Sequence, residues 1–258
     1  MFRNAEAYER VMGRWSRRLA PLLIGFGGLS DRDSVLDVGC GTGSLTFSLP
    51  LLADIAAATG IDISEAYVEY ARSRNTDRRI RFEQADACAL PFEDHSFDRA
   101  FSLLVLQFVP EPARAVAEMR RVVHPGGTVT AAVWDDVGGL PHIRMLFDIA
   151  AVLDRSVKRP YFRPLSAPDD MAVMWRATGL TDVEQTSLLI RMEFSSFDDY
   201  WSPFTTGEGP PGQLLASLTE PARTALQDHV RYAYLAGKPD GPRSFAAVAW
   251  ACRGTVPE

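Results

Sequence analysis

The chain has 258 residues, of which 47% are hydrophobic and 23% charged, a balance typical of a globular protein rather than a disordered or fibrous one. Its formal net charge of −6 gives no overall basic field, so we expect no nucleic acid partner. The three cysteines show no CxxC spacing, which argues against a disulfide framework and against a metal site. No basic-then-apolar leader and no apolar run long enough to span a bilayer is visible, so we expect a cytoplasmic protein without membrane contact.

The first part of the chain predicts a helix, a loop and a strand followed by a turn. Apolar side chains recur at spacings of three and four from Ala5 to Leu19, as on one face of a helix. Three glycines then predict a loop: Gly25, Gly27 and Gly28. Ser34 to Val38 is apolar and β-branched and predicts the first strand, and Ser44 to Leu52 predicts a helix beyond a glycine turn.

The middle of the chain alternates strand and helix patterns. The strand patterns are Ile55–Ile61, Ile80–Gln84, Asp98–Leu104 and Thr128–Trp134. One helix is expected from the N-cap Ser64 to about Arg74, and another from Pro112 to near Val123, where His124-Pro125-Gly126-Gly127 predicts a turn. This alternation predicts βαβ units around a parallel sheet.

The last part is less regular. Asp169 to Thr178 predicts a helix capped by Gly179, while Val183–Phe194 and Ser244–Cys252 predict strands. We therefore expect one α/β domain over residues 1–258, a doubly wound, Rossmann-like, mostly parallel seven-stranded sheet with helical lid insertions. Its expected parts are a helical segment at 1–29, a cofactor-binding core at 30–136, and lid or substrate insertions at 137–168 and 196–241.

A glycine turn and two acids carry the chemistry. In Val35-Leu36-Asp37-Val38-Gly39-Cys40-Gly41-Thr42-Gly43, glycines at alternate positions let the backbone approach a bulky ligand that any Cβ would meet. Asp62 ends the second strand, where an acid can accept both hydroxyls of a ribose. Asp86 follows the third strand and can accept from an adenine amine. The structural alternatives are an acid at a helix start for Asp62 and a capping acid in a loop for Asp86.

The ordered motifs identify a resemblance to the class I S-adenosylmethionine-dependent methyltransferases, in particular to small-molecule enzymes related to the quinone-biosynthesis C-methyltransferases. The resemblance covers roughly residues 30–135. Its motifs are Val35 to Gly43, Gly60-Ile61-Asp62-Ile63-Ser64, Gln84-Ala85-Asp86-Ala87 with Leu90-Pro91-Phe92, Ser96-Phe97-Asp98, and Val123-His124-Pro125-Gly126-Gly127. Each motif is moderately specific, and the ordered set is highly specific. Ser44 stands where an NAD fingerprint would continue toward its third glycine, which disfavours NAD.

On the methionine side, the resemblance implies a role for each matching residue. Four residues of the turn would hold the methionine part of the cofactor: Asp37, Gly39, Gly41 and Gly43. The carbonyls of Ser102 and Leu103 would lie beneath the methionine amino group. Gln107 stands where relatives often carry histidine, which leaves its role less defined. Tyr8 and Arg14 would meet the methionine carboxylate, although Arg14 fits a solvated helix position equally well.

On the adenosine side, the resemblance implies contacts from two strand ends. Asp62 would bind the ribose and Ile63 would flank the adenine. Asp86 and Ala87 would face the adenine edge.

No catalytic residue is assigned by the sequence. His142 is a candidate base on the first insertion, and Asp135 and Asp136 could orient a substrate or simply form a turn. The expected role of Cys40 is only to provide a small side chain inside the glycine turn. Six aromatic residues could line a pocket, but would serve equally well in the core: Trp15, Phe108, Trp134, Tyr161, Phe162 and Trp201.

The expected function is transfer of a methyl group from S-adenosylmethionine to a small, partly apolar molecule at carbon, oxygen or nitrogen, with S-adenosylhomocysteine as the product. The sulfonium is already activated, so the protein mainly has to align the acceptor and exclude water, which needs no metal. The alternatives are a non-catalytic S-adenosylmethionine-binding protein or partner subunit, and an NAD-dependent oxidoreductase. The acceptor and the oligomeric state stay open.

Overall fold

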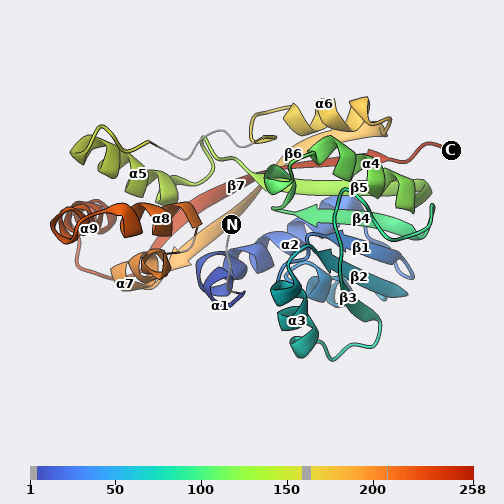
Figure 1. Cartoon of the computed structure of the whole chain (residues 1–258), viewed down its shortest axis with the longest axis horizontal. Helices are drawn as coiled ribbons and strands as arrows, with labels where there is room; N and C mark the ends of the chain where they lie inside the picture. The colour runs from blue at the N-terminus through green and yellow to red at the C-terminus, as the bar shows by residue number, and fades with distance from the viewer. Residues whose placement is uncertain (1–4, 159–163, 208) are drawn as a thin grey trace.

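The computed structural model describes residues 5–158, 164–207 and 209–258, and centres on a seven-stranded sheet of order β3-β2-β1-β4-β5-β7-β6 (Figure 1). Its strands are β1 Ser34–Val38, β2 Ala57–Asp62, β3 Ile80–Gln84, β4 Phe97–Leu103, β5 Val123–Trp134, β6 Thr181–Phe194 and β7 Arg243–Thr255. β1 to β5 pair in parallel, whereas β7 runs antiparallel between β5 and β6. The predicted doubly wound, mostly parallel seven-stranded sheet is confirmed.

Helices cover both faces of the sheet. The helical segments are α1 Ala5–Tyr8, the π-helical η1 Glu9–Gly13, α2 Arg14–Gly27, η2 Thr46–Leu51, α3 Glu65–Arg74, η3 Leu106–Phe108, α4 Pro112–Val122, α5 Pro141–Leu153, α6 Asp170–Ala177, α7 Phe197–Trp201, η4 Ser202–Thr206, α8 Gly209–Ser217 and α9 Glu220–Leu235. Val35 faces a core shared with α2 and α3, whereas Leu36 and Val38 face a second core shared with α4 and α6. Alternate residues of one strand therefore belong to opposite cores, which explains why the parallel strands are apolar throughout.

Two predictions near the start of the chain are wrong. Most of the expected loop at the three glycines is helical, since α2 continues through Gly25 and ends at Gly27, and Gly28 caps it with φ of 74°. A Cβ on Gly27 would lie 2.2 Å from the ring of Phe101, so this glycine permits close packing of α2 on the sheet. The expected helix from Ser44 is a turn followed by the short 3₁₀ helix η2, whose Pro50 has no N–H to donate to a longer helical ladder.

The predicted turn at residues 124–127 is also corrected. β5 begins at Val123, not at Thr128, and its pairing with β4 shifts between the pairs Phe97–Val123 and Arg99–Thr128. The intervening residues bulge from the ladder with Gly126 at φ of 80°, and its N–H donates to the carbonyl of Val256 instead. The turn-forming residues are thus accommodated inside a strand.

Smaller differences lie at element ends. β1 and β3 match their predicted bounds, whereas β2 begins at Ala57 instead of Ile55, and β4 is displaced by one residue toward the amino terminus. α4 and α6 lie within one residue of their predicted ends. β6 begins two residues earlier than predicted and β7 ends three residues later, because Thr181 pairs with Thr255 and Glu184 pairs with Arg253. At the other end, β6 and β7 continue to pair with each other beyond the end of β5, from Leu189–Val248 to Phe194–Arg243.

This β6–β7 extension carries a helical lobe beside the carboxyl edge of the sheet (Figure 1). α7, η4, α8 and α9 lie between β6 and β7 in the chain, and α5, from the segment after β5, packs against α8 and α9. Five aromatic rings pack in the lobe: Phe194, Tyr200, Phe204, Tyr234 and Phe245. The two predicted insertions thus contact each other, while Tyr161 and Phe162 lie outside the described residues. None of the helices in the described ranges is long and apolar enough to cross a membrane.

Candidate cofactor site

The glycine turn follows β1 where the sheet order reverses between β1 and β4, the usual position of a ligand crevice in such sheets. Gly39, Gly41 and Gly43 have φ values of 76°, 53° and 88°. A Cβ on Gly39 would lie 2.4 Å from Val105, so the turn packs closely on the segment after β4. A Cβ on Gly41 would meet nothing within 4 Å, so Gly41 presents bare backbone to open space.

Asp62 ends β2 and is fixed by two backbone donors. The N–H of Gly41 donates to Oδ2 and the N–H of Ser64 to Oδ1, both at 2.9 Å. Burial raises the pKa of Asp62, and these hydrogen bonds act in the opposite direction. The N–H of Ile63 also donates toward this carboxylate, whose two oxygens together have lone pairs left for a further hydroxyl donor. Support of the start of α3 through Ser64 and binding of a ribose are therefore compatible roles.

Asp37 is a buried carboxylate with one unpartnered oxygen. It is 1% exposed, and the hydroxyl of Thr46 donates to its Oδ2 at 2.5 Å. Its Oδ1 is buried and has no hydrogen-bond partner in the described part of the chain. Burial raises the pKa of Asp37 to about 7. An ammonium group would supply both the missing donor and a compensating charge, as the methionine part of the predicted cofactor does.

The end of β4 forms the opposite wall. Ser102 is fully buried, and its hydroxyl donates to the carbonyl of Val38 at 2.9 Å, which ties β4 to β1. Leu103 is 7% exposed, and Leu104 after it has φ of 64°, a strained value of the kind that concentrates at functional sites. Gln107 is buried, and its Oε1 lacks a hydrogen-bond partner among the residues described. Gln107 therefore offers a second unused acceptor.

The predicted adenine contacts lie at the ends of β2 and β3. Ile63 is 61% exposed directly after Asp62 and presents an apolar surface. Asp86 is exposed and its Oδ1 accepts from the N–H of Cys88 at 2.8 Å, which is the loop role considered as the alternative. Ala87 is half-buried beside it. The roles of these residues toward an adenine stay predictions.

Tyr8 and Glu9 bring the amino-terminal segment to this edge. Burial raises the pKa of Tyr8 to about 12, and the charges of Glu9 and Asp62 add to that effect. The Tyr8 ring centroid lies 5.8 Å from that of Tyr67, in α3 after Asp62. The hydroxyls of Tyr8 and Ser16 are 3.0 Å apart. Glu9, which was not predicted as a site residue, accepts from the Thr42 hydroxyl at 2.5 Å and also pairs with Arg17. Its π-helical setting in η1 has no signal in the apolar pattern that predicts the helix.

Arg14 is placed at the lobe and not beside the acids of the turn. Its Nη1 donates to Asp199 Oδ1 at 2.7 Å and its Nη2 to the Asp199 carbonyl at 3.3 Å. The guanidinium also lies over the rings of Trp15 and Phe194, at 4.2 and 4.9 Å. The structure therefore uses Arg14 to join α2 to α7. The Arg14 Nε is buried without a hydrogen-bond partner in the described part of the chain, and the predicted contact of Arg14 with a cofactor carboxylate stays a prediction.

His142 lies in the lobe as a buried, neutral imidazole. It is 3% exposed, its ring packs near those of Phe194 and Phe245, and its Nδ1 has no hydrogen-bond partner in the described ranges. Tyr200 donates its hydroxyl to the His142 carbonyl at 2.8 Å. Burial lowers the pKa of His142 to about 3, and the charge of Arg14 adds to this. At neutral pH such an imidazole has one N–H donor and one nitrogen acceptor, and it does not take up a second proton.

Other candidate side chains have structural partners. Asp135 accepts from the N–H groups of Val137 and Gly138 at 3.0 and 2.8 Å, so it forms a turn after β5. Burial raises the pKa of Cys40 well above its usual value, which keeps the thiol protonated. In the parts of the chain that are described, no group of three or more His, Cys, Asp or Glu side chains could hold a metal ion.

Comparison with known proteins agrees with the geometry of this edge. Residues 36–131 match the family model described as a methyltransferase domain. The 27-O-demethylrifamycin SV methyltransferase of Amycolatopsis mediterranei is 39% identical over 114 residues, 43% of this chain and 42% of its own. The O-methyltransferase cnsE of Penicillium expansum is 32% identical over 160 residues, 60% and 55% of the two chains. The chain thus spans about half the length of these curated relatives.

Solved structures share the architecture. The YcgJ protein of Bacillus subtilis superimposes with a TM-score of 0.61 at 19% identity, covering 93% of this chain and 99% of that one. At this identity the likeness concerns the fold. Together, the strand order, the glycine turn with its two acids and the methyltransferase domain matched over residues 36–131 make this chain similar to the class I S-adenosylmethionine-dependent methyltransferases.

Proposed function

We propose that this protein transfers a methyl group from S-adenosylmethionine to a small-molecule acceptor at carbon, oxygen or nitrogen. The observation that carries the proposal is Asp62, fixed by the N–H groups of Gly41 and Ser64 with acceptor capacity to spare. It stands beside a glycine turn whose Gly41 faces open space. A ribose diol and a flat, bulky cofactor fit this combination.

Different polar groups at the carboxyl edge of the sheet bind different parts of the cofactor. Asp62 accepts from a ribose hydroxyl, and Asp37 Oδ1 accepts from the methionine ammonium. The bare turn at Gly39 to Gly43 admits the methionine chain at van der Waals distance. The bound cofactor supplies a sulfonium methyl, so the protein has to position the acceptor and exclude water rather than activate the donor.

The helical lobe is the proposed acceptor side of the site. It projects beyond β5 on the β6–β7 extension, at the same edge as the glycine turn (Figure 1). His142 is neutral, and its low pKa makes it a hydrogen-bonding group that orients an acceptor hydroxyl or amine, not a general base that stores the proton. The surrounding aromatic rings favour an acceptor with apolar surface.

Two further observations support a small acceptor. Two of the relatives that match the core are named for methylation of oxygen, one of them on a rifamycin. The net charge of −6 makes a nucleic acid acceptor unfavourable. We therefore propose a small molecule, and not nucleic acid or a membrane, as the partner of this site.

The test is methyl transfer itself. Purified protein is incubated with S-adenosylmethionine carrying a labelled methyl group and a panel of phenols, enols and amines, and products are identified by mass spectrometry. A labelled product whose formation is lost in Asp62→Ala supports the proposal. Binding of the cofactor without transfer to any acceptor class, in the presence of the intact lobe, would favour the non-catalytic alternative.

A further inference from the structure

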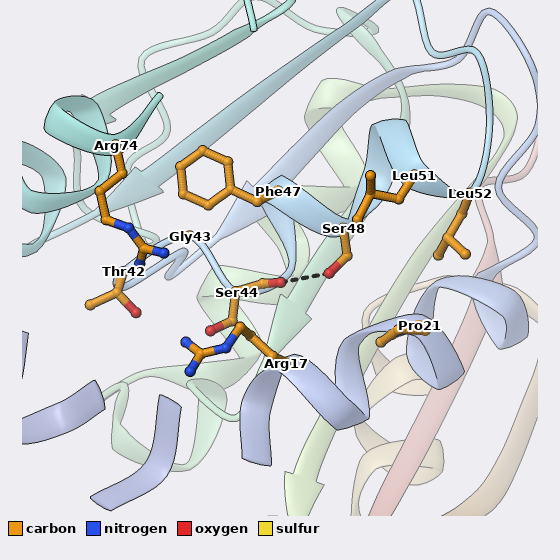
Figure 2. Close-up of a pocket in the computed structure, with 10 residues that line it drawn as sticks. All are labelled: Arg17, Pro21, Thr42, Gly43, Ser44, Phe47, Ser48, Leu51, Leu52 and Arg74. Carbon is orange, nitrogen blue, oxygen red and sulfur yellow. Dashed lines mark hydrogen bonds between the residues drawn. The ribbon is translucent and has the colours of Figure 1, made fainter. Parts of the chain in front are cut away.

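A groove beside the glycine turn shares one residue, Gly43, with the predicted cofactor contacts. It has a volume of about 400 Å³, and it lies between α2, the turn leading into η2, and the end of α3 (Figure 2). That volume lies within the usual range of small-molecule sites. Neither Asp37, Asp62, Asp86, Leu103 nor Gln107 lines it. Its only link to the cofactor edge is the segment 42–44, which belongs to the glycine turn.

One end of the groove is polar and cationic. Figure 2 shows Arg17 and Arg74 at the same end as Thr42 and Ser44. The Nη1 of Arg17 pairs with the Glu9 carboxylate, and the other N–H groups of its guanidinium are further donors. Arg74 is exposed and lies over the Tyr70 ring at 5.5 Å. No acidic side chain is among the described residues that line the groove, but Glu9 pairs with Arg17 and accepts from the Thr42 hydroxyl, so two guanidinium groups and one carboxylate lie at this end. This end is therefore complementary to an anion.

A buried hydroxyl strengthens that assignment. Ser44 is 8% exposed, and its Oγ is a buried atom without a hydrogen-bond partner in the described ranges. The dashed bond in Figure 2 is a separate one, from the Ser48 hydroxyl to the Ser44 carbonyl at 2.8 Å. A polar atom buried without a partner is costly, so an oxygen ligand at this end would satisfy it.

The other end is apolar and open. Leu51 is 81% exposed and Leu52 is 49% exposed, and both lie near Pro21 at that end of the view (Figure 2). Phe47 lies between the two ends. Two adjacent leucines at the rim of a groove give an apolar chain a surface to cover.

We propose that this groove binds a small amphipathic anion, with a phosphate, sulfate or carboxylate head between Arg17, Arg74 and Ser44 and a short apolar tail over Leu51 and Leu52. The head takes charge-assisted hydrogen bonds from the two guanidinium groups and accepts the Ser44 hydroxyl. The tail removes the leucine side chains from water. The ligand would contact residues 42–44, next to the predicted contacts of the cofactor.

The test is calorimetric titration of the full-length protein with hexyl phosphate, hexanoate, hexanol and inorganic phosphate. We expect saturable binding of hexyl phosphate, with hexanol and inorganic phosphate at least tenfold weaker because each lacks one half of the ligand. Comparison with hexanoate shows whether the head is a phosphate or a carboxylate. Arg74→Gln should weaken hexyl phosphate about tenfold, whereas the matched control Arg78→Gln, on the exposed loop after α3, should not.

Two further variants separate binding from folding. Leu51→Glu changes a side chain that is already exposed, so the fold should persist while the added charge abolishes hexyl phosphate binding. S-adenosylhomocysteine affinity should stay within about twofold of wild type in Arg74→Gln. Equal binding by Arg74→Gln and Arg78→Gln, or no saturable binding by wild type, would overturn the proposal. Loss of S-adenosylhomocysteine binding in Arg74→Gln would overturn it as well, because the groove would then be part of the cofactor site.

Discussion

Replacing Asp37 with asparagine should stabilise the free protein while weakening its binding of the cofactor. Burial raises the pKa of Asp37 from 3.8 to about 7, so at pH 8 the folded protein holds a buried carboxylate with one unpartnered oxygen. A shift of roughly 3 units corresponds to about 4 kcal/mol. An asparagine amide left unpaired there costs about 1–3 kcal/mol, which leaves a net gain of about 1–3 kcal/mol for Asp37→Asn.

The sign of the effect depends on pH. A carboxylate whose pKa is raised by folding carries no penalty below its unfolded pKa of 3.8, and the full penalty above about 7. The gain in unfolding free energy should therefore be present at pH 8 and absent near pH 4. Urea denaturation at the two pH values measures it. Asp54→Asn is the control, because the Asp54 side chain is 86% exposed and its replacement should change stability by less than about 0.5 kcal/mol.

The same variant should bind S-adenosylhomocysteine 10- to 100-fold more weakly at pH 8, because a hydrogen bond to a charged partner is worth about 1.5–3 kcal/mol. Calorimetric titration measures this loss. A variant that is less stable than wild type at pH 8, or that keeps wild-type affinity, would refute the assignment of Asp37 Oδ1 to an ammonium group.

Three further outcomes follow from the geometry. Gly41 has a left-handed φ of 53°, so Gly41→Ala should lower the free energy of unfolding by about 1–2 kcal/mol. It should also lower the affinity for S-adenosylhomocysteine at least tenfold, and retained affinity would show that Gly41 does not face the ligand. Because burial lowers the pKa of His142 from 6.5 to about 3, unfolding free energy should fall by up to about 1.4 kcal/mol per unit as pH drops below 6.5, and a His142→Gln variant with the same slope would contradict this. A double-mutant cycle with Arg14→Gln and Asp199→Asn should give a coupling of about 0.5–1 kcal/mol, since both side chains are 29% exposed; zero coupling would mean that this pair does not hold the lobe.

Local sequence was sufficient for the bounds of β1 and β3 and for the place of Asp62 at the end of β2. β1 and β3 have their predicted bounds because each is an apolar or alternating run bounded by polar or turn residues. Asp62 was placed at a strand end by its distance from the glycine turn, and the structure puts it in contact with Gly41. Both inferences use only the pattern and the spacing of residues that are close in the sequence, and these do not depend on distant residues.

Features that depend on distant partners could not be predicted. The glycine-rich segment around Gly27 has the composition of a loop. Gly27 is nevertheless helical, because Phe101 of β4 packs against it. The pairing of Arg14 with Asp199 joins residues 185 apart in the chain, and only the folded β6–β7 extension brings them together. Glu9 contacts Thr42 through a π-helical turn, for which the sequence pattern has no signal.

The most direct measurement is calorimetric titration of wild-type protein and Asp62→Ala with S-adenosylhomocysteine and with NAD. The assignment predicts micromolar binding of S-adenosylhomocysteine to wild type, no binding of NAD, and an affinity at least about 30-fold lower in Asp62→Ala, with urea denaturation showing that the variant is folded. Binding of NAD, or an S-adenosylhomocysteine affinity unchanged by the loss of the Asp62 carboxylate, would contradict it.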